Sequence, residues 1–330
     1  MAVHDQSPTR RRLLTQAAAG AALVASGAAS AQPAPVERAK GPLVWLDMDQ
    51  KALDDAYDQA VYAPNREIVI KRCIRNSELA RERLGAPKRF AYGPTSFEGL
   101  DVFTAKTPNA PIMIYVHGGS WRVGTASQYH YAAEMFLNAG ANYVVPDFAN
   151  VGDVGGSLLV MADQIRRSVA WVYNNAKSFG GDPERIYVSG QSSGGHWIGV
   201  LMTTDWKDYG VPMTIIKGGA SGSGMYDLKP VRLSKRSEFV KFTDETEEKL
   251  SAQRHLDKLV ARIALVYGSL ETPEFQRQSR DFYAAVKAAG KPVTLSVMEG
   301  YNHFEVMESI GDPYSLFGRA ALEVMKLRPA

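Results

Sequence analysis

The stretch Arg185–His196 constrains the fold of this chain more than any other. It reads Arg-Ile-Tyr-Val-Ser-Gly-Gln-Ser-Ser-Gly-Gly-His. Its apolar start, Ile186–Val188, predicts a short buried strand, and the apolar run Trp197–Met202 predicts a helix soon after the glycines. A strand, a G-x-S-x-G turn and a helix form the context in which a sharp, strained turn presents a serine as a nucleophile. Gly190 and Gly194, two positions to either side of that serine, leave room for the turn.

The rest of the chain alternates between predicted strands and helices. Continuous apolar strands separated by helices predict a mostly parallel sheet covered on both faces, with ligands bound at the carboxyl ends of the strands. This context favours the nucleophile turn over a plain glycine- and serine-rich loop. The strands are expected at 111–116, 142–145, 186–188, 214–216, 263–267 and 293–297, and the helices at 49–62, 66–84, 127–139, 158–179, 197–202, 273–289 and 314–327.

Length and composition fit one large domain. The chain has 330 residues, of which 45% are hydrophobic and 22% charged. We expect a single domain over residues 43–330. Within it, residues 43–90 are expected to form a lid-like helical segment, although their charged helix also fits a solvated surface helix, and residues 222–260 are expected to form an insertion beside the carboxyl edge of the sheet. The net charge of +3 gives no indication of a nucleic-acid partner, and the single cysteine, Cys73, excludes an internal disulfide.

The first 31 residues have the features of an export signal. Arg10, Arg11 and Arg12 precede two leucines, a weakly apolar run follows, and Ala29-Ser30-Ala31 gives a small-x-small cleavage pattern. The paired arginines are similar to those of a twin-arginine signal, which implies the twin-arginine export machinery as a partner. We therefore expect a signal at 1–31, a linker at 32–42 and a periplasmic or secreted protein. The alternatives are an ordinary secretory signal and a basic disordered tail. The apolar run is too short and too rich in alanine to span a membrane.

A nucleophilic serine needs a base, usually a histidine held by a carboxylate. Of the six histidines, His303 directly follows the last predicted strand, so its ring can reach Ser192 from the carboxyl edge of the sheet. The acid is expected after the preceding strand, because the chain order of such a fold is serine, acid, histidine. Glu271 lies in that turn and is the predicted acid. Glu274, which also fits a solvated position at a helix start, and the more distant Asp257 are the alternatives.

The negative charge that develops on a substrate oxygen needs backbone N–H donors. His117-Gly118-Gly119-Ser120-Trp121 follows the strand at 111–116, and its glycines allow the backbone to approach a substrate closely. The predicted donors are the amides of Gly118, Gly119 and Ser193. His117 and His196 are expected to brace loops through hydrogen bonds, and Trp121 is expected to form part of the pocket wall.

Together these motifs resemble the α/β-hydrolase fold. The chain is similar to the esterase branch that includes arylformamidases and small lipase-like esterases, and the resemblance covers residues 45–328. It rests on the segments His117–Trp121, Gly190–His196, Glu271–Ser279 and Asn302–Phe304. One departure is that the oxyanion segment has two glycines and then Ser120, where hormone-sensitive-lipase-like esterases carry three glycines. The resemblance implies the catalytic set Ser192, Glu271 and His303.

These features predict a serine hydrolase that cleaves small carboxylic esters through an acyl-enzyme. An arylformamidase, another aryl-amidase or a carbamate hydrolase would use the same residues, and a non-catalytic binding protein on this fold is the alternative from another class. No metal-ligand cluster, phosphate loop or dinucleotide fingerprint occurs in the sequence, so no cofactor is expected. The expected partner is a small ester or aryl amide, and the expected state is a monomer or a homodimer.

Overall fold

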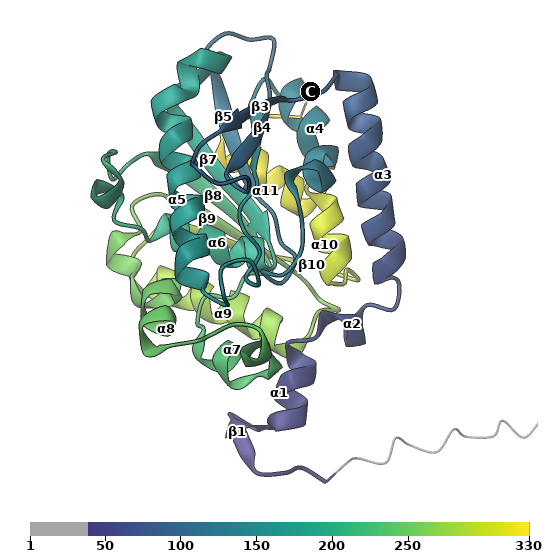
Figure 1. The fold of residues 1–330 in the computed structure, drawn as a ribbon. Coiled ribbons are helices and arrows are strands. Elements are labelled where there is room, and N and C mark those ends of the chain that lie inside the picture. The colour runs from purple at the N-terminus through teal and green to yellow at the C-terminus, as the bar shows by residue number, and fades with distance from the viewer. Residues whose placement is uncertain (1–38, 330) are drawn as a thin grey trace, which may run out of the picture. The chain divides into compact units, whose positions relative to one another are not determined.

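This computed structural model describes residues 39–329. An eight-stranded sheet forms the centre of the fold (Figure 1). The strands lie in the order β10-β9-β8-β7-β5-β6-β4-β3, and β10 to β6 pair in parallel, whereas β4 and β3 pair antiparallel. The mostly parallel sheet is therefore confirmed. The strands are β3 Lys88–Ala91, β4 Gly99–Phe103, β5 Ala110–Val116, β6 Asn142–Pro146, β7 Gly181–Gln191, β8 Ile216–Gly222, β9 Arg262–Gly268 and β10 Val293–Met298.

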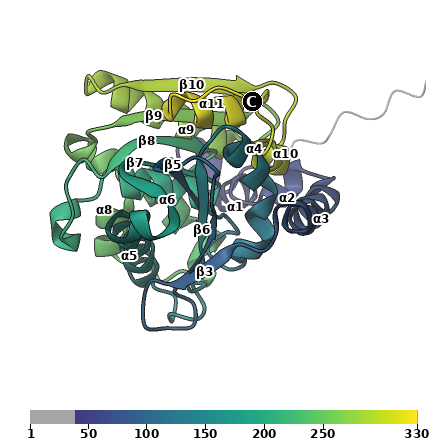
Figure 2. The ribbon, with the colours of Figure 1, turned by 90° about the horizontal axis from the view of Figure 1, so that it is seen from above.

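Apolar side chains alternate between the two faces of this sheet. In β5, Ile112 and Ile114 belong to the core on one face, and Met113 and Tyr115 belong to the core on the other. Helices α5, α6 and α9 cover the first face, and α3, α4, α10 and α11 cover the second (Figure 2). The helices that cover the sheet are α3 Arg66–Leu84, α4 Ala133–Asn138, α5 Leu158–Asn175, α6 Ser193–Met202, α9 Pro273–Ala288, α10 His303–Ser309 and α11 Leu316–Val324.

The segment 43–90 is less helical than predicted. It begins with the antiparallel hairpin of β1 (Leu43–Trp45) and β2 (Met48–Asp49) and ends in β3, the edge strand of the main sheet. The helix expected at 49–62 is two helices, α1 (Gln50–Ala56) and α2 (Gln59–Tyr62). The break has a local cause, because the Asp58 side chain accepts a hydrogen bond from the Ala60 amide and so caps a new helix.

Strand β8 lies further along the chain than predicted. A strand was expected at 214–216, but the structure begins it at Ile216 and continues through a glycine-rich run to Gly222. The glycines are required because helices press on both faces: a Cβ on Gly219 would lie 3.0 Å from Met202 Sδ, and one on Gly222 would lie 3.0 Å from the Phe317 ring. Close packing thus replaces the β-branched side chains by which strands are usually recognised.

Other elements follow from local capping. Strands β3 and β4 and helix α10 were not predicted, and the helix expected at 127–139 is a 3-10 turn, Ala126–Ala132, followed by α4. Helix α10 begins at His303 because the Asn302 side chain accepts hydrogen bonds from the amides of Phe304 and Glu305. Residues 222–260 hold the helices α7 (Lys229–Leu233) and α8 (Asp244–Leu250) and short 3-10 turns at Lys235–Glu238, Ala252–Arg254 and Leu256–Lys258. Further 3-10 turns are Ala176–Phe179 and Trp206–Tyr209.

The expected signal, residues 1–31, lies outside the described residues. Across residues 39–329, no helix combines the length and the apolar character that crossing a membrane requires.

Candidate active site

Ser192 lies at the junction of β7 and α6 in a backbone conformation that serine rarely adopts. Its φ is +61° and its ψ is −125°. The Ser192 amide donates a hydrogen bond to the Gly222 carbonyl oxygen over 2.9 Å, which fixes the turn to the end of β8. A Cβ on Gly194 would lie 2.2 Å from the Val116 carbonyl oxygen, and one on Gly190 would lie 2.6 Å from the same atom. Only glycine fits these two positions, so the local sequence sets the turn.

Glu271 and His303 come together on the same edge of the sheet. The His303 Nδ1 lies 2.7 Å from Glu271 Oε2, and both side chains are buried. Because a carboxylate only accepts, Nδ1 carries the proton and Nε2 is left as the acceptor. The other carboxylate oxygen, Oε1, accepts from the Gly268 amide over 2.8 Å and from the Ser223 hydroxyl over 2.5 Å. These contacts hold both the carboxylate and the ring in one orientation.

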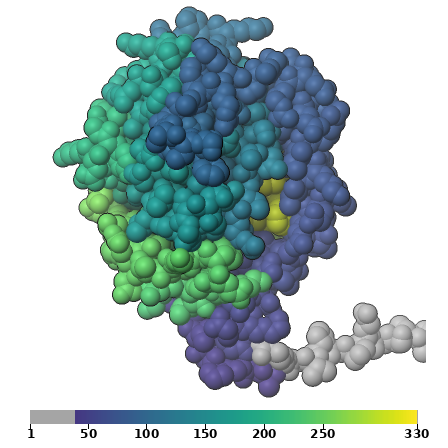
Figure 3. Space-filling model, in the orientation of Figure 1, coloured from purple at the N-terminus to yellow at the C-terminus, as the bar shows by residue number. Residues whose placement is uncertain are grey.

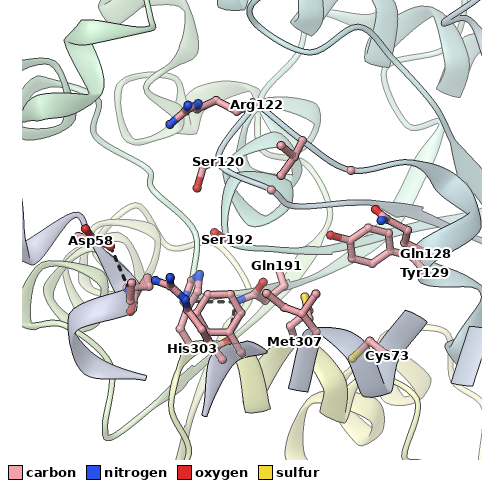
Figure 4. Close-up of a pocket in the computed structure, with 18 of the residues that line it drawn as sticks. Asp58, Cys73, Ser120, Arg122, Gln128, Tyr129, Gln191, Ser192, His303 and Met307 are labelled. Atoms are coloured by element: carbon pink, nitrogen blue, oxygen red, sulfur yellow. Dashed lines mark hydrogen bonds between the residues drawn. The ribbon is translucent and has the colours of Figure 1, made fainter. Parts of the chain in front are cut away.

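A cavity of about 610 Å³ joins these groups, a volume typical of a small-molecule site. Ser192 and His303 both line it, as do Ser120 and Arg122 (Figure 4). In the described chain no hydrogen bond joins the Ser192 hydroxyl to His303, a looseness that is common in unliganded sites. The wall comes from distant parts of the chain, listed here in order: Tyr57, Asp58, Gln59, Ala60, Arg66, Ile70, Cys73, Ile74, Gly119, Ser120, Arg122, Val123, Gly124, Gln128, Tyr129, Gln191, Ser192, Arg236, His303, Phe304 and Met307.

The two predicted oxyanion glycines have different surroundings. Gly119 lines the cavity with a φ of +114°, whereas a Cβ on Gly118 would lie 2.7 Å from the Gln191 carbonyl oxygen. Gly118 thus lets the loop approach β7. The amides of the three predicted donors, Gly118, Gly119 and Ser193, donate to no acceptor within residues 39–329. Free N–H groups of this kind are what an oxyanion needs.

Comparisons with known proteins agree with this architecture. The BD-FAE family model matches residues 100–213. Kynurenine formamidase of Danio rerio is 28% identical over 294 residues, which cover 85% of this chain and 98% of that protein. A putative thioesterase from Silicibacter sp. superposes with a TM-score of 0.71 at 23% identity, covering 82% of this chain and 98% of that one. The esterase 2 of Thermogutta terrifontis phosphoramylated by tabun superposes with a TM-score of 0.60 at 18% identity, covering 74% and 93%.

The chain has the α/β-hydrolase fold. The order of its strands, the turn that carries Ser192 and these structural neighbours all agree on the fold.

Two further residues of this chain support the site and were missed by the sequence analysis. Gln191 donates from its side-chain amide to the His303 carbonyl oxygen over 2.9 Å and so fastens the start of α10 to the end of β7. Ser223, which donates to Glu271, has a φ of +48° and is fully buried. Gln191 could have been found as the variable residue of the G-x-S-x-G motif. Ser223 could not, because it follows a strand whose end was misplaced.

The alternative acid, Glu274, has a different role from the one predicted for it. A carboxylate at a solvated helix start was expected, but Glu274 is fully buried. It accepts from Arg277 over 2.6 and 2.8 Å and from the Tyr57 hydroxyl over 2.9 Å. The prediction of a solvated surface was therefore wrong. Tyr57 belongs to the segment before α2, so this buried pair fastens the N-terminal segment to α9.

Trp121 was predicted to form part of the cavity wall, but it does not line the cavity. Its ring is buried in the core, edge-on to His196 with the ring centroids 5.2 Å apart and 6.4 Å from Trp197. The chain turns sharply here, with positive φ at Ser120 and Trp121, and this turn sends the indole inward while Arg122 and Val123 face the cavity.

His117 and His196 both hold loops through hydrogen bonds, as expected of them. His117 Nδ1 donates to the Gly118 carbonyl oxygen over 2.9 Å, and its ring stacks on Phe148. His196 Nε2 donates to the Leu250 carbonyl oxygen over 3.0 Å, which ties α6 to the segment 222–260. Burial lowers the pKa of both rings, and that of His196 falls to about 3. Both histidines are therefore neutral at physiological pH.

His196 should make the stability of the protein depend on pH. The unfolded ring binds a proton below about pH 6.5, but the folded ring does not until about pH 3. The unfolded state then holds more protons, so the free energy of unfolding falls as the pH falls through this window, by up to about 1.4 kcal/mol per pH unit. In His196→Gln this slope should be smaller by that amount when urea unfolding is followed between pH 4 and 7. The comparison at pH 7.5 isolates the loss of the hydrogen bond, and an unchanged slope would contradict a neutral buried ring.

Proposed function

We propose that this α/β-hydrolase is a serine hydrolase that cleaves small carboxylic esters. The observation that carries the proposal is the strained Ser192 turn on the wall of a cavity that it shares with His303, whose Nδ1 is held by Glu271. An esterase phosphoramylated by tabun is among the structural neighbours. That reaction is typical of a nucleophilic serine, which supports the same reading of Ser192.

In the proposed reaction, each of these residues acts in a defined step. Ser192 attacks the ester carbonyl while His303 Nε2 takes its proton, and Glu271 stabilises the imidazolium that forms. The amides of Gly118, Gly119 and Ser193 donate to the developing oxyanion, and Gly118 also allows the close approach of the loop to β7. His303 then returns the proton to the departing alkoxide. Water, activated by the same ring, releases the acyl group and restores Ser192.

A formamidase is the second candidate. The relative from Danio rerio, named kynurenine formamidase, matches 85% of this chain and 98% of its own length, and the same residues would cleave an N-formyl aniline. The proposed export argues against it, since formylkynurenine from tryptophan breakdown is formed in the cytosol. The ratio of kcat/KM for N-formylkynurenine and for a phenyl ester separates the two activities.

Replacing the nucleophile should abolish turnover without unfolding the protein. In Ser192→Ala we expect p-nitrophenyl ester hydrolysis to fall by at least about 10⁴-fold, because no covalent intermediate can form. Labelling by a fluorophosphonate probe should also disappear, while the melting temperature stays close to that of the wild type. Ser120→Ala, which removes a second serine hydroxyl from the cavity wall, should still be labelled. Near-full activity of Ser192→Ala would rule out the assignment.

The two glutamates should give opposite phenotypes. Glu271→Gln keeps an oxygen for Gly268 and Ser223 but presents N–H to His303, which favours the wrong ring tautomer, so kcat should fall by about 10⁴ with little change in stability. Glu274→Gln weakens the buried contacts to Arg277 and Tyr57 and should lower the free energy of unfolding by about 1–3 kcal/mol while sparing kcat. Steady-state kinetics and urea unfolding of both variants decide the matter. Exchanged phenotypes would make Glu274 the acid.

We also propose export through the twin-arginine machinery to the periplasm or beyond. The support is the sequence alone, because Arg10–Arg12, the apolar run and Ala29–Ala31 lie outside the described residues. A single cysteine is compatible with folding in a reducing cytosol before export.

The arginine pair should be required as arginine. A receptor reads the pair rather than its bulk charge, so Arg10→Lys combined with Arg11→Lys should leave precursor in the cytoplasm despite the unchanged charge. Cell fractionation and N-terminal sequencing measure this, and the mature chain is expected to begin at Gln32. Normal export of the double variant, or an exported protein that begins at Met1, would contradict the proposal.

A further inference from the structure

The cavity wall includes a buried arginine that forms no ion pair within residues 39–329. Arg236, in the 3-10 turn Lys235–Glu238, is only 4% exposed and lines the same cavity as Ser192. Its Nη2 donates to the Tyr57 carbonyl oxygen over 3.1 Å, but Nε and Nη1 are buried and meet no acceptor in the described chain. Buried charges in proteins are normally paired, because an unpaired one is costly to desolvate.

Aromatic rings partly stabilise the positive charge of Arg236. Its guanidinium carbon lies 5.4 Å from the centroid of the Trp121 ring and 5.9 Å from those of Tyr57 and Phe275. Cation–π contacts of this kind stabilise a guanidinium but leave its N–H donors unused. Burial lowers the pKa of Arg236 to about 10, so the side chain still carries its charge at neutral pH.

No neighbouring carboxylate within residues 39–329 forms an ion pair with Arg236. Asp58, a carboxylate on the cavity wall, attracts Arg236 without an ion pair between them, because its carboxylate is paired with Lys235 over 2.6 Å. Arg122, which lines the cavity beside Ser120 in Figure 4, forms no ion pair within residues 39–329 and acts on Arg236 as a like charge. Arg66 forms an exposed ion pair with Glu67 at 3.1 Å and attracts Asp58. The wall therefore carries an excess of positive charge.

A second buried polar group without partners lies on the same wall. Gln59, at the start of α2, is 6% exposed, and neither its amide nitrogen nor its amide oxygen has a hydrogen-bond partner in the described residues. Gln59 is two residues from Tyr57, whose carbonyl accepts from Arg236. Native proteins rarely leave buried groups unsatisfied, and two such side chains on one cavity indicate that a bound molecule completes their hydrogen bonds.

We propose that Arg236, together with Gln59, forms a subsite for a carboxylate group of the substrate. The preferred substrates are then esters, or amides, that carry a free carboxylate in addition to the bond that Ser192 attacks. A guanidinium presents parallel N–H donors that match the two oxygens of a carboxylate, and a buried site strengthens this pairing. The inference rests on the proposed function only for the identity of the reaction, because anion binding itself needs no catalysis.

Matched substrates with and without the charge test the subsite. On the acyl side, p-nitrophenyl hydrogen succinate is compared with p-nitrophenyl succinamate, and on the alcohol side, meta-acetoxybenzoate with meta-acetoxybenzamide. Wild-type kcat/KM should favour the carboxylate in at least one pair. In Arg236→Met, which removes the charge and keeps an apolar side chain of similar length, that preference should fall by about 10- to 100-fold, the range expected for hydrogen bonds to a charged group. Arg236→Lys should retain part of it.

Arg232→Met is the matched control. Arg232 lies in the same segment, pairs with Asp244 and Glu247 at the surface and does not line the cavity, so its loss should leave the preference unchanged. A preference that is absent in the wild type, or that survives in Arg236→Met, would overturn the proposal and leave Arg236 as a packing residue among aromatic rings. Such a residue would change the melting temperature but not the ratio between paired substrates.

Binding without turnover separates the subsite from the reaction. In Ser192→Ala, calorimetry should detect meta-hydroxybenzoate or succinate binding more tightly than the corresponding amides, and the additional change Arg236→Met should remove the difference. If the wild type cleaves none of the esters but this difference is present, the proposed function fails and the subsite stands. If the esters are cleaved and the difference is absent, the subsite fails and the proposed function stands.

Discussion

The contact between two backbones, at Gly194 and Val116, determines where the candidate active site lies. Any side chain on Gly194 would place its Cβ 2.2 Å from the Val116 carbonyl oxygen, so α6 can start this close to β5 only from a glycine. That closeness forces the chain to reverse within a residue, and Ser192 takes the strain with a φ of +61°. The hydroxyl is thereby held at the carboxyl edge of the sheet, where it faces the cavity rather than the core.

The ends of the neighbouring strands then assemble the rest of the site. Gly222, the last residue of β8, accepts from the Ser192 amide, and the next residue, Ser223, holds Glu271. Gly268, at the end of β9, donates to the same carboxylate. One short edge of the sheet thus fixes nucleophile and acid relative to each other. The base, His303, is the first residue of α10. Figure 3 shows a few C-terminal residues, in yellow, at the surface between the blue α3 and the teal part of the chain.

The sequence predicts the parts of this arrangement that depend on local sterics and chain order. The turn at Ser192 follows from glycines at fixed positions, and the pairing of Glu271 with His303 follows from the order of the strands that precede them. The sequence does not predict what depends on packing between distant segments. Strand β8 was misplaced because helices on both sides exclude side chains from it, and Glu274 looked like a surface residue because Arg277 and Tyr57 reach it only in the folded chain.

Trp121 shows the same limit at the scale of a single side chain. The position of Trp121 in the loop after β5 correctly predicted that it lies near the site. The direction of its indole, however, depends on positive φ values at Ser120 and Trp121, which the residue types do not predict. The indole then becomes one of the rings against which Arg236 lies. Trp121, which was expected to contact substrate, therefore contacts Arg236 of the cavity wall instead.

Tyr57 connects the two buried charges beside the cavity. Its hydroxyl donates to Glu274, whose charge Arg277 balances, and burial holds the pKa of Tyr57 well above its usual range, so the hydroxyl remains a donor. Its carbonyl oxygen and its ring both contact Arg236, which has no ionic partner of its own in the described chain. The Glu274–Arg277 pair thus holds Tyr57 in place, and Tyr57 in turn positions Arg236. An anion subsite built in this way depends on the N-terminal segment as much as on residues 222–260, and neither segment belongs to the strand-and-helix alternation from which the catalytic groups could be predicted.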